Sequence, residues 1–357
     1  MKKLLLSTAV ALTLATTAQA DSHGEKVKLG VLLGFTGPIE STVAEMGPAA
    51  DMAIAEVNAA GGILGGKMVE AVRADSTCVD SAAATAAAER LITSDKVAGI
   101  VGADCSGVTT AVLTNVAMAN GMVMISPSAT SPALSTVKDN DLFFRTAPSD
   151  ARQGAVMADV IMDKKIKEVA LTYTNNDYGK GLADAFQKSY EAAGGKVTVS
   201  VSHEDGKADY AAEVGALAAA GGEVLVVAGY LDQGGKGIIQ GSLDTGAFDK
   251  FVLPDGMVGD KLGEAIGSDL DGSFGQAPGT DSSGAATFEK MSEGFDGTAP
   301  FTKETYDAAA LILLAMEAAG STNPKDYKGK IMSVANAPGV KIQPGELNWG
   351  LRILAAG

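Results

Sequence analysis

The chain has 357 residues, of which 46% are hydrophobic and 20% charged, a composition that excludes a disordered or collagen-like protein. Its 28 basic and 43 acidic residues give a net charge of −15, and no Lys/Arg cluster interrupts the acidity. A nucleic-acid backbone or an anionic membrane would be repelled, so neither is expected as a partner.

Residues 1–20 have the pattern of a secretory signal peptide. Lys2 and Lys3 precede an apolar stretch over 4–14, and Ala18-Gln19-Ala20 forms a small-residue cleavage site. The apolar stretch is shorter than the ~20 residues that a membrane-spanning helix needs. We therefore expect cleavage after Ala20 and export of the mature chain to the periplasm, without a lipid anchor, because no cysteine follows the cleavage site.

An oxidising compartment affects the interpretation of the two cysteines, Cys78 and Cys105. In such a compartment they are expected to form one disulfide, and two buried free thiols are the alternative.

Apolar runs of strand length alternate with stretches of helical period through most of the mature sequence. Before Pro148, strands are predicted over 27–33, 68–74, 97–102 and 122–125, and helices over 44–60, 81–92 and 108–119. After it, helices are predicted over 151–162, 181–193, 210–219 and 235–243, and strands over 168–173, 196–201, 223–228 and 251–253. This alternation predicts a doubly wound α/β protein with parallel sheets.

The number of strands exceeds what one ordinary sheet holds, so two lobes are expected. Residues 143–150 have the character of a crossover that ends at a helix cap. The loose segment 275–284 would be a second crossover, followed by helices over 285–295 and 303–319. The expected division is a signal peptide of 1–20, an N-terminal lobe of 21–145 plus about 278–357, and a C-terminal lobe of 146–277.

The usual catalytic motifs are absent from the sequence. There is no P-loop, no G-x-G-x-x-G after a strand and no G-x-S-x-G, and the two histidines, His23 and His203, are far apart. We therefore expect a binding protein without cofactor or metal. The alternative is an exported α/β enzyme, which turnover by the purified protein would reveal.

Hydroxyl-rich loops follow two successive predicted strands. Ser106 would stand at the start of a helix, where free backbone N–H groups attract an anion such as a carboxylate, and Ser126, Ser128 and Thr130 follow the next strand. Helix or turn capping is the alternative for Ser106, Ser126 and Thr130. Asp255 follows the strand over 251–253 and places a carboxylate at the corresponding edge of the second lobe. A site that binds a carboxylate in one lobe, facing a site that binds a cation in the other, is the arrangement expected of an amino acid receptor.

Several segments, each weak alone, together resemble one family over nearly the whole mature chain. They are Lys28-Leu29-Gly30-Val31, Thr36-Gly37-Pro38, Asn58-Ala59-Ala60-Gly61-Gly62-Ile63, Tyr178-Gly179-Lys180-Gly181 and Phe301-Thr302-Lys303-Glu304-Thr305-Tyr306-Asp307-Ala308. The sequence in this respect resembles the type I periplasmic solute-binding proteins of ABC transporters, within the leucine/isoleucine/valine-binding family. The resemblance implies two α/β lobes joined by a multi-crossing hinge that close over a ligand.

The resemblance also implies roles for particular residues. Cys78 and Cys105 match the family's disulfide, and Ser106 matches its carboxylate-binding serine. Thr130 matches a threonine that contacts both ends of the zwitterion, the Ser128 carbonyl would accept from the ammonium, and Asp255 falls where the family has an acid. The aromatic positions that match the closing lobe and the pocket wall are Tyr178, Tyr230 and Phe301, for which ordinary packing is the alternative.

The sequence departs from the family at three places. Asp255 stands where well-known members have Glu and is one methylene shorter. No aromatic lies near Thr42, which predicts a wider or more polar side-chain pocket. Over 350–357 the chain ends where relatives continue into strands of a third hinge crossing, so a truncated sequence and a shortened hinge are both open.

We therefore expect a monomeric substrate-binding component that captures a branched-chain or small aliphatic amino acid and delivers it to ABC permease subunits. The alternative is the same scaffold with a short amide, urea or an aromatic carboxylate as ligand.

Overall fold

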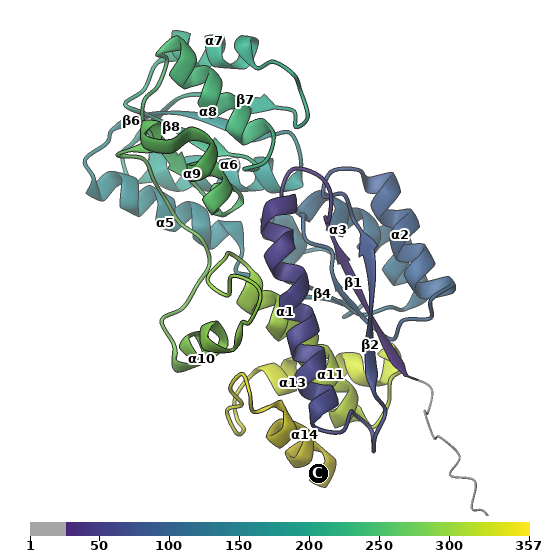
Figure 1. Ribbon diagram of the computed structural model, residues 1–357. Helices are drawn as coiled ribbons and strands as arrows, with labels where there is room; N and C mark the ends of the chain where they lie inside the picture. The colour runs from purple at the N-terminus through teal and green to yellow at the C-terminus, as the bar shows by residue number, and fades with distance from the viewer. Residues whose placement is uncertain (1–25) are drawn as a thin grey trace, which may run out of the picture.

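The computed structural model describes residues 26–357, which form two α/β lobes (Figure 1). The predicted signal peptide and its cleavage site lie outside the described residues. Each lobe is built on a five-stranded sheet, with strand order β2-β1-β3-β4-β5 in the first and β10-β9-β8-β6-β7 in the second. All the strand pairs are parallel. The predicted doubly wound fold with two lobes is confirmed.

The first sheet is formed by the N-terminal part of the chain. Its strands are β1 (Val27–Leu33), β2 (Val69–Asp75), β3 (Ile100–Gly102), β4 (Met124–Ser126) and β5 (Phe143–Arg145). The helical segments between them are α1 (Glu40–Ala59), α2 (Ser81–Thr93), α3 (Ser106–Val112), the π-helical η1 (Leu113–Ala117), α4 (Met118–Asn120) and η2 (Pro132–Ser135). The β1 sequence VKLGVLL is almost entirely buried, as expected for a parallel sheet covered on both faces.

The second sheet repeats this pattern with the middle of the chain. Its strands are β6 (Glu168–Thr174), β7 (Lys196–His203), β8 (Val224–Ala228), β9 (Phe251–Leu253) and β10 (Phe274–Gly275). Its helical segments are α5 (Asp150–Asp163), α6 (Asp177–Ala192), α7 (Ala211–Ala220), α8 (Gly234–Thr245), η3 (Asp255–Met257), α9 (Asp260–Ile266) and η4 (Gly267–Leu270).

The last part of the chain returns to the first lobe. It comprises α10 (Ser283–Met291), α11 (Thr302–Ala319), α12 (Pro324–Tyr327), η5 (Lys328–Lys330), α13 (Ile331–Ala335) and α14 (Leu347–Ala356). Helix α11 packs against α1 (Figure 1). The Glu56 carboxylate of α1 accepts hydrogen bonds from the backbone N–H of Leu347 at 2.7 Å and of Gly345 at 3.1 Å, which ties the terminal helix to the lobe.

Two described segments connect the lobes. The first, 146–149, leads from β5 to α5, and the second, 276–282, leads from β10 to α10. Gln276 Nε2 in the second segment donates to the backbone carbonyl of Gln153 at 3.1 Å, so the second connection lies beside the first turn of α5, which follows the first connection. The expected lobe boundaries, 21–145 with about 278–357 and 146–277, stay a prediction.

Several element boundaries differ from the predicted ones. Residues 143–145, predicted as part of a crossover, form β5, because they pair with β4 in the folded sheet. Helix α1 begins at Glu40 rather than at residue 44, and β3 covers Ile100–Gly102 rather than 97–102. Strand β10 and helices α9, α12, α13 and α14 were not predicted, because short elements carry too little periodicity. No helix among residues 26–357 is long and apolar enough to cross a membrane.

Candidate functional site

The carboxyl ends of the strands in both lobes border one small cavity. In each sheet the strand order reverses beside the first strand, at β1–β3 and at β6–β8, and ligands of open α/β sheets bind at such points. The cavity is lined by Ile39, Thr42, Asp104, Cys105, Ser106, Ser128, Tyr178, Tyr230, Asp255, Gly256 and Phe301. Its volume of about 30 Å³ is close to the space of one water molecule, so a larger solute requires the lobes to separate.

Six of the seven predicted site residues line this cavity, and the seventh, Thr130, follows the lining residue Ser128 by two positions in the chain. The Thr130 carbonyl accepts a hydrogen bond from the Asp150 N–H at 2.8 Å. Thr130 Oγ1 is buried and has no hydrogen-bond partner among the described residues. The structure therefore brings the predicted residues together, and their contacts with a ligand stay a prediction.

A disulfide joins the loops that follow β2 and β3. Cys78 and Cys105 are bonded, with their Cα atoms 5.1 Å apart, as the sequence predicted. Cys105 is the N-cap residue of α3, so the bond fixes the start of this helix and with it Ser106. The Ser106 hydroxyl accepts from the Ser131 N–H at 3.0 Å, which links the loop after β3 to the loop after β4.

The loop after β4 is held by its own hydroxyl groups. Ser126 Oγ donates to the Ala103 carbonyl and accepts from the Ala129 N–H at 2.9 Å, while Ser128 Oγ donates to the Asp104 carbonyl at 3.1 Å. The capping alternative is thus correct for Ser126, whose hydroxyl organises its own turn. The Ser128 side chain also has a structural role, which is compatible with a ligand contact through its carbonyl.

Asp255 and Tyr178 are hydrogen-bonded polar residues that the second lobe contributes to the cavity. Tyr178 Oη donates to Asp255 Oδ1 at 2.6 Å, and the Gly256 N–H donates to the same oxygen at 2.9 Å. The Tyr178 ring stacks on Tyr230, with ring centres 5.1 Å apart. Burial raises the pKa of Asp255, and the hydrogen bond from Tyr178 opposes this rise. Tyr230 Oη, by contrast, is buried without a hydrogen-bond partner in the described part of the chain.

A second buried carboxylate, Asp150, was missed by the sequence analysis. It is fully buried at the start of α5, and its pKa is raised well above the usual value, first by burial and then by the negative charge of Asp255. Gln153 connects the two acids: its Nε2 donates to Asp150 Oδ1 at 2.7 Å, and its Oε1 accepts from the Asp255 N–H at 3.0 Å. Asp150 Oδ2 has no hydrogen-bond partner among residues 26–357.

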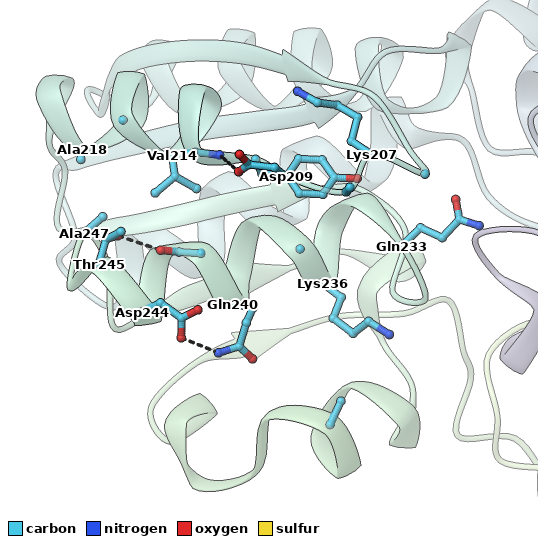
Figure 2. Close-up of a pocket in the computed structure, with 18 of the residues that line it drawn as sticks. Lys207, Asp209, Val214, Ala218, Gln233, Lys236, Gln240, Asp244, Thr245 and Ala247 are labelled. Atoms are coloured by element: carbon cyan, nitrogen blue, oxygen red, sulfur yellow. Dashed lines mark hydrogen bonds between the residues drawn. The ribbon is translucent and has the colours of Figure 1, made fainter.

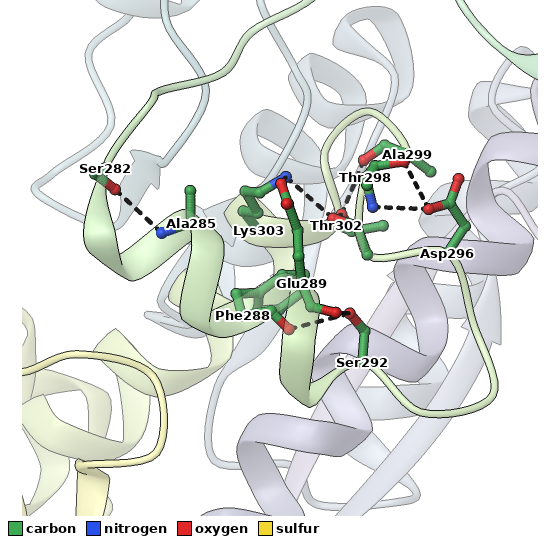
Figure 3. Close-up of polar contacts among 11 residues, drawn as sticks. Ser282, Ala285, Phe288, Glu289, Ser292, Asp296, Thr298, Ala299, Thr302 and Lys303 are labelled. Atoms are coloured by element: carbon green, nitrogen blue, oxygen red, sulfur yellow. Dashed lines mark hydrogen bonds and ion pairs between the residues drawn. The ribbon is translucent and has the colours of Figure 1, made fainter.

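Phe301 reaches the cavity because of an unusual turn before α11. Its φ of +66° is in the left-handed region, which is uncommon for a bulky residue. Thr302 Oγ1 donates to the Ala299 carbonyl at 2.8 Å, and Lys303 Nζ donates to the Gly297 carbonyl at 3.0 Å and pairs with Glu289 of α10 at 2.9 Å (Figure 3). These contacts brace the turn and hold the Phe301 ring, which is 7% exposed, in the cavity wall.

Asp104 is another buried acid that the sequence analysis did not single out. Its carboxylate accepts from the Gly34 N–H and from Ser76 Oγ, both at 2.6 Å, and so joins the loops after β1 and β2. Burial raises its pKa, and these hydrogen bonds oppose the rise. Both Asp104 oxygens have protein partners, so this side chain holds together the loops beside the cavity.

The cavity lining carries acidic but no basic side chains. Among residues 26–357, those that line it include Asp104 and Asp255, and no Lys or Arg. Arg145 lies near Asp150 but donates to the carbonyls of Ala129 at 3.2 Å and Ser131 at 2.9 Å. A positively charged group is therefore the electrostatic complement of this end of the site.

A larger hollow lies elsewhere, on the outside of the second lobe. It is an open groove of about 1130 Å³ between α7 and α8, bordered by Tyr210, Lys236 and Gln240 (Figure 2). Gly237 lets the Tyr210 ring pack closely against α8, and Gly215 faces open space. None of the predicted site residues borders it.

Fold and cavity together define a two-lobed solute-binding protein, and comparison with known proteins agrees. The sequence pattern of the periplasmic binding protein family matches residues 26–341, and the chain belongs to this family. It is the solute-binding component of an ABC transporter, and the expectation of a binding protein rather than an enzyme is confirmed.

Named relatives cover most of the chain. An amino acid binding protein of Pseudomonas aeruginosa is 30% identical over 90% of this chain and 87% of its own length. A Leu/Ile/Val-binding protein homolog of Brucella melitensis is 31% identical over 90% of this chain and 86% of its own.

Solved structures show the same architecture. The branched-chain amino acid transporter substrate-binding protein of Streptococcus pneumoniae, in complex with isoleucine, is 27% identical with a TM-score of 0.72, over 86% of this chain and 88% of that one. A solute-binding protein of R. palustris in complex with 4-hydroxybenzoate, at 21% identity and a TM-score of 0.70, over 90% of this chain and 88% of that one, shares the fold.

Proposed function

We propose that this protein captures an α-amino acid with a branched or other small aliphatic side chain between its lobes and delivers it to ABC permease subunits. The observation that carries the proposal is the pair of buried acids, Asp150 and Asp255, beside a cavity without basic lining. An ammonium group would compensate the negative charge of Asp255 and add to the compensation that nearby Arg145 gives Asp150, whereas an uncharged amide or a carboxylate without an ammonium would not. The names of the relatives support the same class of ligand.

The opposite end of the cavity suits the ligand carboxylate. Ser106 lines the cavity in the first lobe, and two buried hydroxyls, Thr130 Oγ1 of the first lobe and Tyr230 Oη of the second, lack hydrogen-bond partners among the described residues. Buried hydroxyls without partners are destabilising unless a ligand or water satisfies them. We assign Ser106 and Thr130 to the carboxylate, and Asp255, Thr130 and the Ser128 carbonyl to the ammonium, with Asp150 adding negative charge.

The remaining wall suits an aliphatic side chain. Ile39 and Phe301 are buried apolar residues of the cavity, and Thr42 is a polar residue of the same lining. The absence of an aromatic at Thr42 supports a pocket that admits small and branched side chains without selecting leucine alone.

The proposal includes the cellular context. We propose that the chain is exported to the periplasm, that cleavage follows Ala20, and that the mature protein acts as a monomer. Mass spectrometry of the exported protein would identify its N-terminal residue, which is Asp21 on this proposal, and light scattering would give its mass in solution.

Calorimetric titration of the mature protein, refolded to remove any co-purified solute, tests the ligand assignment. The panel contains the twenty amino acids with urea, acetamide and benzoate. Saturable binding of aliphatic amino acids supports the proposal. Binding of only an amide, urea or benzoate would retain the transport class and overturn the roles of Asp255 and Asp150.

A further inference from the structure

Helix α1 begins without a capping side chain of its own. Its N-cap residue is Ile39, which offers no hydrogen-bond acceptor to the first free N–H groups of the helix. Helices usually start at Ser, Thr, Asp or Asn, whose side chains satisfy these groups. The start of α1 lies toward the second lobe in the overall view (Figure 1).

The missing acceptor comes from the other lobe. Asp232, which follows β8 in the second lobe, accepts from the Ser41 N–H at 3.0 Å and from Ser41 Oγ at 2.8 Å through the same oxygen, Oδ2. In addition, the Asp232 N–H donates to the Pro38 carbonyl at 3.1 Å. One residue of the second lobe thus makes three hydrogen bonds to the first, on both sides of Ile39.

These contacts adjoin the cavity on both lobes. On the first lobe, Ile39 and Thr42 line the cavity, and Ser41 lies between them in the sequence. On the second lobe, Tyr230 lines the cavity and precedes Asp232 by one intervening residue. Separation of the lobes would break the Asp232 contacts and withdraw Ile39 and Thr42 from the cavity together.

We propose that Asp232 and Ser41 form an interlobe clasp that caps α1 only in the closed protein and sets the rate at which solute leaves. The negative carboxylate is favourable at the positive end of the α1 dipole, and opening exposes both partners to water. Neither Ser41 nor Asp232 lines the cavity, so the clasp would act on residence time rather than on the choice of solute. The inference rests on lobe closure by a solute-binding protein, and not on the ligand being an amino acid.

The test compares Asp232→Ala with Asp249→Ala in the full mature chain. Asp249 is an exposed aspartate of the same lobe, so the control removes the same charge without touching the first lobe. With radiolabelled L-leucine as probe, Asp232→Ala should speed dissociation about five- to tenfold, the effect of losing one helix cap, with association changed less than about twofold. Ser41→Ala should have a smaller effect, because the backbone N–H of residue 41 still donates to Asp232.

A second readout does not depend on the ligand. Spin labels at Lys67→Cys in the first lobe and Lys188→Cys in the second, both exposed positions, report the interlobe distance in the ligand-free protein. Asp232→Ala should shift the distance distribution, and Asp249→Ala should not. Combining Ser41→Ala with Asp232→Ala should add nothing, since the carboxylate accepts both bonds.

The outcomes separate the two proposals. If leucine does not bind the unsubstituted protein, the amino acid assignment fails, and the distance measurement still decides the clasp. If Asp232→Ala and Asp249→Ala give the same distance distribution and the same dissociation rate, the clasp is overturned.

Discussion

The Tyr178 hydroxyl donates a 2.6 Å hydrogen bond to Asp255, and the Tyr178 ring stacks on Tyr230. The carboxylate is thereby held in one orientation, with one oxygen occupied by Tyr178 and the Gly256 N–H. The other oxygen is the one that can meet a ligand.

Asp255→Asn should weaken amino acid binding by about 2–4 kcal/mol, the loss expected for a buried charged hydrogen bond. Titration calorimetry with L-leucine or L-valine measures this change. Asp249→Asn, at an exposed position, serves as the control for the altered net charge. Unchanged affinity in Asp255→Asn would remove the ammonium assignment.

Asp150→Asn separates ligand binding from stability. Because the pKa of Asp150 is raised by burial and by Asp255, its ionised form is unfavourable in the folded protein. The substitution should stabilise the ligand-free protein at pH 8 by about 1–2 kcal/mol and weaken amino acid binding about tenfold. Urea denaturation and calorimetry give the two quantities. A variant that loses stability and keeps its affinity would contradict this role.

Removal of the disulfide should destabilise the first lobe. The bond closes a loop with a sequence separation of 27 residues, which corresponds to about 3–4 kcal/mol on the loop-entropy scale. Comparison of urea denaturation for the native protein and for the Cys78→Ala/Cys105→Ala variant tests this value. A loss below about 1 kcal/mol would mean that packing alone fixes the two loops.

Two helical glycines should respond in opposite ways to alanine. At Gly179, in the first turn of α6, an added Cβ would lie 2.2 Å from the Thr174 carbonyl oxygen and 2.8 Å from the Thr174 nitrogen. Gly179→Ala should therefore cost about 2 kcal/mol or more and displace Tyr178. At Gly215, within α7, nothing lies within 4 Å, so Gly215→Ala should stabilise by about 0.5–1 kcal/mol. Thermal denaturation of both variants measures these changes in stability. Similar changes in the two variants would refute the steric explanation.

Glu304, in the first turn of α11, predicts a specific pH dependence of stability. Burial raises its pKa to about 7 from 4.5. A raised carboxyl pKa means that the folded state binds more protons, so this contribution is fully present below about pH 4.5 and is lost as the pH rises through about 7.

Glu304→Gln should therefore match the unsubstituted protein near pH 4.5 and exceed its stability at pH 8 by about 1 kcal/mol, allowing for partial exposure. Urea titrations at the two pH values provide the measurement. If the stability difference between Glu304→Gln and the unsubstituted protein were the same at both pH values, the pKa of Glu304 would not be raised.

The alternation of strands and helices was predictable because parallel sheets covered by helices have strong local patterns. Strands β1 and β9 match the predicted bounds at both ends. Strand β5 was missed because Phe143–Arg145 becomes a strand only by pairing with β4. The start of α1 was placed too late because its first turn depends on Asp232 from the other lobe rather than on a local cap.

The candidate site was predictable where loops follow strands directly. Ser106, Ser128 and Asp255 each lie just beyond a strand and line one cavity. Asp150 was missed because it has the local pattern of a helix start, and its contacts with the Asp255 region run through Gln153, 102 residues away from Asp255. An Asp followed three residues later by Gln, as at Asp150 and Gln153, indicates a site only once the structure shows that Asp255 lies next to them.

The disulfide beside Ser106 has a kinetic consequence. Because it fastens the loops after β2 and β3 within a single lobe, we expect this half of the site to keep its shape when the lobes separate. A solute would first dock on this rigid half in a concentration-dependent step, and a concentration-independent step would then bring Asp255 and Tyr230 over it. Stopped-flow traces should accordingly contain two phases: a faster one whose rate rises with solute concentration, and a slower one whose rate levels off once the docking step is saturated.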